Sequence, residues 1–149
     1  MAIKRILVAT DFDESSKHAL QLALELQTKF QAELTLVHVW ELPSFGYMEV
    51  VPIPEEVLNQ ISKAAEVRMA ALVASIEGQC PNTKSLVKMG NVHSEVLRVV
   101  AETGADLLVL GTHGRRGLQR ALLGSVAEKL VRTSPIPVLT VHGGQDRHQ

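Results

Sequence analysis

The 149-residue chain has little of several features that mark particular classes of protein. It has one cysteine, Cys80, which excludes an internal disulfide framework and is typical of a reducing compartment. Its net charge is -1 and no long run has one sign, so no basic face for nucleic acid is expected. No apolar run approaches the ~18 residues of a membrane span, and the first run is too short for a signal peptide. We therefore expect a cytoplasmic protein that binds no nucleic acid and does not insert into membranes.

What the chain does contain is mostly aliphatic. Hydrophobic residues make up 46% of it and aromatic residues 3%, so we expect a core of Leu, Val, Ile and Ala. A chain of this length suits a single domain that buries a sizeable core. We expect that domain to cover residues 1–142 and the polar residues 143–149 to form a disordered tail.

Short β-branched runs alternate with segments whose apolar residues recur at helical spacing. The expected strands cover residues 3–9, 33–40, 84–89, 106–110 and 136–141. The expected helices cover residues 14–30, 55–77 and 93–102, and a fourth ends at Thr133. This alternation predicts an α/β domain with an open, parallel, five-stranded sheet and helices on both faces, Rossmann-like, in the strand order 3-2-1-4-5. Asp13 or Ser15 is expected to cap the first helix, and Gly78 to end the second.

Residues 105–127 carry the pattern most suggestive of ligand binding. An apolar run stops at Gly111, Gly114 follows, and Gly124 and Ser125 begin the next helix, so that the spacing is G-x2-G-x9-G-S. Neither a Walker A loop nor a Rossmann G-x-G-x-x-G fingerprint is present. A helix start offers unpaired N–H groups that suit an anion such as phosphate, and a glycine lets the ligand approach the backbone closely. The alternative reading is that the three glycines only make turns.

The first strand supplies a second signal. In open parallel sheets, ligands bind beyond the carboxyl ends of the strands, where the strand order reverses. If the first and fourth strands are neighbours, Asp11 and Gly111 flank that crevice. Asp11 could then accept hydrogen bonds from ribose hydroxyls, while residues 111–125 hold phosphates.

With these motifs the chain resembles the universal stress protein family, in its ATP-binding branch. The resemblance covers nearly the whole chain, through ILVATDF, LTLVHVW, DLLVLGTHG and LLGSVAEKLVRTSPIPVLTV. It implies a stress-response regulator that binds ATP with Mg²⁺ or Mn²⁺ and has a protein partner that the sequence does not identify. It also implies a homodimer joined through the last strand, from Pro137 to Val141, which is otherwise an unpaired apolar edge.

The resemblance also assigns roles to single residues. Asp11 would bind ribose or, through phosphates, a metal ion, and Val39 would present its backbone to adenine. The other residues implied in nucleotide binding are Thr10, Leu110, Gly111, Thr112, His113, Gly114, Gly124, Ser125 and Val126. The sequence departs from the family pattern at Asp13, where relatives often have Ser, and at Ala127, where many have Ser or Thr. A preference for ATP over ADP or AMP therefore stays open.

Two other functions stay open beside the regulator. A slow ATPase or phosphotransfer enzyme would use Ser125, His113 and Asp11, but Ser125 lacks a G-x-S-x-G setting and the motif holds no obvious carboxylate base. We therefore expect ATP hydrolysis to be slow at most. A nucleotide-free dimeric adaptor would leave the intact glycine motif without a purpose.

Overall fold

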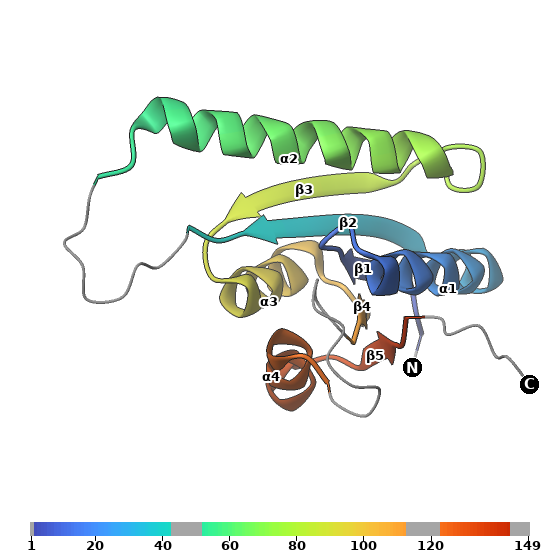
Figure 1. Cartoon of the computed structure of the whole chain (residues 1–149). Coiled ribbons are helices and arrows are strands. Elements are labelled where there is room, and N and C mark those ends of the chain that lie inside the picture. The colour runs from blue at the N-terminus through green and yellow to red at the C-terminus, as the bar shows by residue number, and fades with distance from the viewer. Residues whose placement is uncertain (1, 43–51, 113–122, 144–149) are drawn as a thin grey trace, which may run out of the picture.

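The computed structural model describes residues 2–42, 52–112 and 123–143, which form one twisted sheet covered by helices (Figure 1). The strands are β1 (Arg5–Ala9), β2 (Glu33–Trp40), β3 (Lys84–Met89), β4 (Leu107–Gly111) and β5 (Val138–Val141). Their order is β3-β2-β1-β4-β5, and every pair is parallel. The predicted fold class and strand order are confirmed.

The helices divide between the two faces of the sheet. They are α1 (Glu14–Phe30), α2 (Glu55–Ile76), α3 (Val92–Thr103) and α4 (Ser125–Thr133). Alternate residues of β2 separate the two cores, because successive strand side chains point to opposite faces. Leu34 and Leu36 join the core under α1 and α2, while Val37 and Val39 join the core under α3 and α4. No helix in the described part of the chain is long and apolar enough to cross a bilayer.

The observed helix caps agree only in part with those predicted from the sequence. The Asp13 carboxylate caps α1 by accepting from the Ser16 N–H, as expected. The glycine cap expected at Gly78 is wrong, because α2 ends at Ile76 and its C-cap, Glu77, stays in the right-handed region. The N–H groups of Gln79 and Cys80 both donate to the Ile76 carbonyl, so a tight turn satisfies this carbonyl without a left-handed residue.

Helical spacing predicted the buried face of α2 only partly. Val57 and Ile61 belong to the apolar residues that recur at helical spacing in this segment, yet they are 39% and 38% exposed. A helix of 22 residues is about 33 Å long, whereas the six residues of β3 extend about 20 Å. The N-terminal turns of α2 therefore run past the strand that it covers (Figure 1). Phe30, at the end of α1, is similarly 44% exposed.

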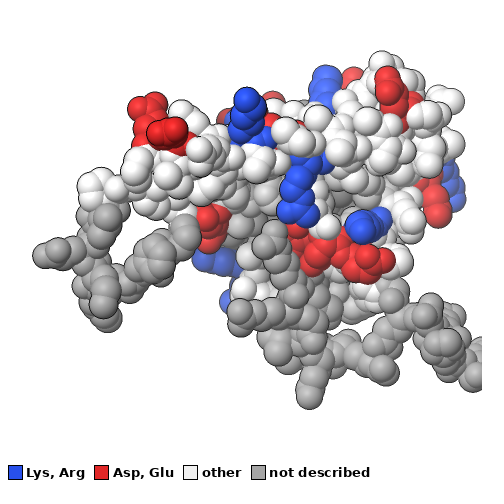
Figure 2. Space-filling model, turned by 45° about the horizontal axis from the view of Figure 1, so that its top comes forward, with Lys and Arg blue, Asp and Glu red and all other residues white. Residues whose placement is uncertain are grey.

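Charges of both signs are mixed on the surface drawn in Figure 2. Lysine and arginine side chains there lie among aspartate and glutamate side chains, and neither sign forms a continuous face. This distribution agrees with the net charge of -1.

The Asp106 carboxylate joins the beginnings of β1 and β4. Its Oδ2 accepts the N–H groups of Lys4 at 2.8 Å and Arg5 at 2.9 Å. These two hydrogen bonds hold the pKa of Asp106 below its ordinary value. At the start of β1 the carboxylate thus accepts backbone N–H groups, as the carbonyl groups of a neighbouring strand would.

We expect Asp106→Asn to melt below the native protein near neutral pH, and this difference to vanish in acid. Since the folded pKa is lowered, the stabilisation is complete above the unfolded value of about 3.9 and is lost as the pH falls through the folded pKa. Thermal unfolding followed by circular dichroism at both pH values measures the difference. A difference that does not change with pH would show that the charge of Asp106 has no stabilising role.

Candidate functional site

A cavity of about 230 Å³ opens where the strand order reverses, at the carboxyl ends of β1, β2 and β4. β1 and β4 are hydrogen-bonded neighbours, so the loops that follow them meet at this edge of the sheet. Every expected binding residue that the structure describes lines the cavity. These are Thr10, Asp11, Val39, Leu110, Gly111, Thr112, Gly124, Ser125 and Val126. His113 and Gly114, expected to contact phosphate, lie outside the described residues.

The inner part of the cavity is apolar. Val37 and Val39 of β2 and Leu110 of β4 form its floor, and Val92 and Val96 of α3 form a wall. The place of α3 at the cavity was not expected, because no motif in this helix links it to the glycine pattern. Such a surface suits a flat, largely apolar group such as a nucleobase.

The outer part of the cavity is polar and includes the N-terminus of α4. The N-cap of this helix is Gly124, which provides no side-chain cap, whereas Asp13 caps α1 and Asn91 caps α3. The first N–H groups of a helix lack partners within it and carry partial positive charge. The uncapped end of α4 therefore presents donors to an anion in the cavity.

Thr112 fixes the position of this helix end. Its carbonyl accepts the Gly124 N–H at 2.6 Å, and its own N–H donates to the Val141 carbonyl at 3.0 Å. Its hydroxyl lies 3.3 Å from Nδ1 of His142, and the residue is 1% exposed. Thr112 thus ties β4, β5 and the start of α4 together, although the sequence predicted only a contact with the ligand.

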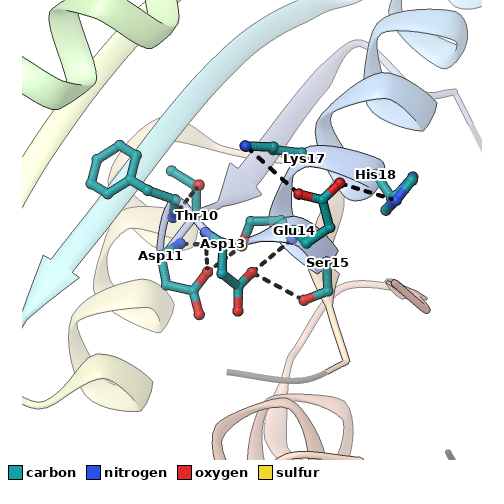
Figure 3. A network of polar contacts seen from close by, with 9 residues as sticks. Thr10, Asp11, Asp13, Glu14, Ser15, Lys17 and His18 are labelled. Atoms are coloured by element: carbon teal, nitrogen blue, oxygen red, sulfur yellow. Dashed lines mark hydrogen bonds and ion pairs between the residues drawn. The ribbon is translucent and has the colours of Figure 1, made fainter. Parts of the chain in front are cut away.

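Two neighbouring carboxyl groups stand at the end of β1 (Figure 3). Oδ1 of Asp11 accepts the Ser16 hydroxyl at 2.6 Å and the Asp13 N–H at 3.1 Å. Oδ1 of Asp13 accepts the Ser16 N–H at 3.0 Å and the Ser15 hydroxyl at 3.2 Å. These bonds orient the loop, and Asp11 is the member of the pair that lines the cavity.

The two carboxyl groups have opposite pKa shifts. Burial and then the adjoining Asp13 carboxyl raise the pKa of Asp11. Partial burial alone would raise the pKa of Asp13, but hydrogen bonds with Asp11, the Ser16 N–H and the Ser15 hydroxyl outweigh it and lower this pKa. Asp13 therefore holds its charge more firmly, and a cation or a hydroxyl donor in the cavity would stabilise ionised Asp11.

Gly111 has a packing role that its sequence position did not reveal. A Cβ atom added there would lie 2.8 Å from the backbone carbonyl carbon of Ser15 in α1. The absence of a side chain thus lets α1 approach β4 closely, in addition to leaving room at the cavity. The packing role of Gly111 was not expected from the sequence.

The sheet order, the helices on both faces and the cavity at the switch point define a doubly wound α/β protein with a cavity beside a glycine helix cap. The family model described as "Universal stress protein family" matches residues 2–142. The chain belongs to the universal stress protein family.

Two relatives show how far the similarity extends. Universal stress protein MJ0577 of Methanocaldococcus jannaschii is 26% identical, over 93% of this chain and 94% of its own length. The solved structure of MJ0577 has a TM-score of 0.83 at 28% identity and covers 98% of this chain and 100% of that one. Universal stress protein A homolog 2 of Coxiella burnetii is 31% identical, over 93% of this chain and 94% of its own length.

Two more distant structures share the fold and hold ligands. A universal stress protein solved in complex with cAMP has a TM-score of 0.62 at 24% identity, covering 97% of this chain and 100% of that one. The universal stress protein from Archaeoglobus fulgidus in complex with dAMP has a TM-score of 0.63 at 20% identity, covering 95% and 99%.

Proposed function

We propose that this protein binds an adenine nucleotide in the 230 Å³ cavity. The observation that carries the proposal is one cavity with an apolar floor, a carboxyl group from β1 and the uncapped start of α4. The base occupies the apolar part between β2 and α3, and Asp11 accepts from the ribose hydroxyls. The phosphates lie at the rim, where Ser125 and Val126 supply backbone N–H groups, since the Gly124 N–H already donates to the Thr112 carbonyl.

The size of the cavity fits this division of the ligand. Drug-sized ligands fill pockets from about 300 Å³ upward, so 230 Å³ suits a base and ribose, with the phosphates at the rim. Fold relatives hold cAMP and dAMP, which are adenine nucleotides with one phosphate. For this chain we propose ATP. Gly111 and the Gly124–Ser125 pair of the glycine motif both line the cavity, and the start of α4 offers N–H groups for further phosphates.

The proposed nucleotide brings Mg²⁺ or Mn²⁺ with it. Among residues 2–42, 52–112 and 123–143, no group of three or more His, Cys, Asp or Glu side chains could hold a metal. Asp11 is the carboxyl group placed to give one ligand, and Mg²⁺ commonly uses one or two carboxylates together with substrate phosphates. The cation would reduce the repulsion between the negative phosphates and the Asp11 and Asp13 carboxylates.

We propose a regulatory role in the stress response, in the cytoplasm, for a nucleotide-binding domain of residues 1–142. Residues 144–149 of the expected tail lie outside the described part. β5 pairs with β4 on one side and its residues are half-buried, which leaves its other side for a second copy and a homodimer. We propose that a protein partner reads the nucleotide state.

Nucleotide titration tests this function. We expect calorimetry to show binding of ATP and AMP, with Mg²⁺ strengthening ATP binding far more than AMP binding, because ATP brings more charge near Asp11 and Asp13. Mass analysis of nucleotide released from the purified protein checks which one is carried. If no adenine nucleotide binds under any metal condition, the dimeric adaptor becomes the better reading. Rapid release of phosphate from ATP would favour the enzyme.

A further inference from the structure

The residue after Asp11 has an unusual backbone conformation. Phe12 has φ of +66°, in the left-handed region that side-chain-bearing residues rarely adopt. Among the described residues, Gln31 is the only other non-glycine residue with positive φ, and it ends a helix, where this conformation is common. Phe12 lies inside the loop that presents Asp11, so a stabilising contact must hold it there.

Contacts from two other elements hold the Phe12 side chain. Its ring centroid lies 4.5 Å from that of His38 in β2, with the planes tilted by 43°. The guanidinium carbon of Arg68 in α2 lies 4.5 Å from the same ring centroid, within cation–π distance. Nδ1 of His38 lies 2.7 Å from the Thr10 carbonyl, which joins the stack to the backbone of the loop.

The two side chains of the loop point in different directions. Asp11 lines the proposed nucleotide cavity, whereas Phe12 lines a second cavity of about 320 Å³ between α1 and α2. The left-handed conformation of Phe12 sends its side chain and that of Asp11 to different cavities. None of the described residues that line the nucleotide cavity belongs to α2.

We propose that Phe12 is a positioning residue for the nucleotide site, held by Arg68 and His38 so that Asp11 faces the ribose. This inference rests on the proposed function and assigns α2 a part in it. Arg68 is exposed, and its charged, planar guanidinium group contacts the half-buried Phe12 ring. Its effect on nucleotide affinity therefore acts through the loop that carries Asp11 and Phe12. A shift of α2 would change how the loop presents Asp11.

Substitution of Arg68 tests the inference, because an exposed residue can be changed without emptying the core. We expect Arg68→Ala to weaken AMP binding about threefold, the scale of one exposed cation–π contact. Phe12→Leu keeps an apolar side chain but removes the ring, and it should weaken binding by a similar factor. The two changes together should weaken it no more than Phe12→Leu alone. Lys63→Ala, which removes another exposed cation of α2, should leave affinity unchanged.

A mutant cycle with Asp11 separates positioning from a general structural effect. In an Asp11→Asn background, which is expected to bind AMP weakly, Arg68→Ala should cause no further loss in an NMR titration. Equal AMP affinities of the native and Arg68→Ala proteins would overturn this inference alone. A threefold loss that persists in the Asp11→Asn background would also overturn it. A native protein that binds no nucleotide would overturn the proposed function, and this inference with it.

Discussion

Replacement of Ser125 by proline is expected to weaken ATP binding about 100-fold while the melting temperature stays unchanged. Ser125 is the first residue of α4, where proline is favoured because the N–H has no partner within the helix. Gly124 before it already has the extended ψ of 156° that a residue before proline adopts. The variant removes one N–H and one hydroxyl from the proposed phosphate contacts. Two hydrogen bonds to a charged group contribute about 3 kcal/mol together, which is a factor of about 100.

The matched control is Ser125→Ala, which removes the hydroxyl and keeps the N–H. It should weaken ATP binding about tenfold, the effect of one such hydrogen bond. Calorimetry with ATP and Mg²⁺ measures both variants, and differential scanning fluorimetry checks their folding. Native affinity in the proline variant would show that the phosphates do not lie at α4. Loss of hydrolysis in Ser125→Ala with binding intact would favour the enzyme.

Gly111→Ala is expected to lower the free energy of unfolding by about 1–3 kcal/mol, the usual effect of overpacking a close contact. A Cβ atom at this position would lie 2.8 Å from the carbonyl carbon of Ser15, which belongs to the α1 backbone and cannot rotate away as a flexible side chain could. α1 packs against β4 along this contact, so a shift there also disturbs the loop that carries Asp11 and Asp13.

Gly78→Ala provides the control for this substitution. A Cβ atom at Gly78 would have no neighbour within 4 Å, and Gly78 does not have a positive φ. We expect its free energy of unfolding to be unchanged or raised by about 0.4–1 kcal/mol, because alanine restricts the unfolded chain. Urea unfolding of both variants measures the difference. Equal effects at the two positions would show that the contact between β4 and α1 tolerates a methyl group.

The strand order could be predicted because its causes are local and general. Each of the first four strands, five to eight residues long, is followed by a helix, and parallel strands joined by right-handed crossovers favour few topologies. The loops after β1 and β4 then meet at one edge of the sheet, which brings Asp11 and Gly124 to the same cavity. Hydrophobic spacing was less reliable where a helix outruns its strand, as Ile61 in α2 shows.

Neither the place of α3 at the cavity nor the contact of α2 with the Phe12 loop could be predicted in this way. Val92 and Val96 carry no motif, and they reach the cavity because α3 crosses the sheet beside β2. Arg68 lies 56 positions after Phe12, and nothing in the local sequence of either residue pairs them. The left-handed conformation of Phe12 likewise follows from its contacts, since phenylalanine by itself disfavours it.

The amino-acid pattern was enough to predict the alternating strands and helices, the sheet order and the two loops that meet at the cavity. Periodicity, caps and glycine spacing act over a few residues, and these suffice for such features. Three contacts follow from the packed fold alone: Gly111 abuts Ser15, Thr112 ties α4 to β5, and Arg68 of α2 reaches the loop that carries Asp11. These contacts join residues that are distant in the chain, and they depend on how helices of particular lengths pack across a twisted sheet.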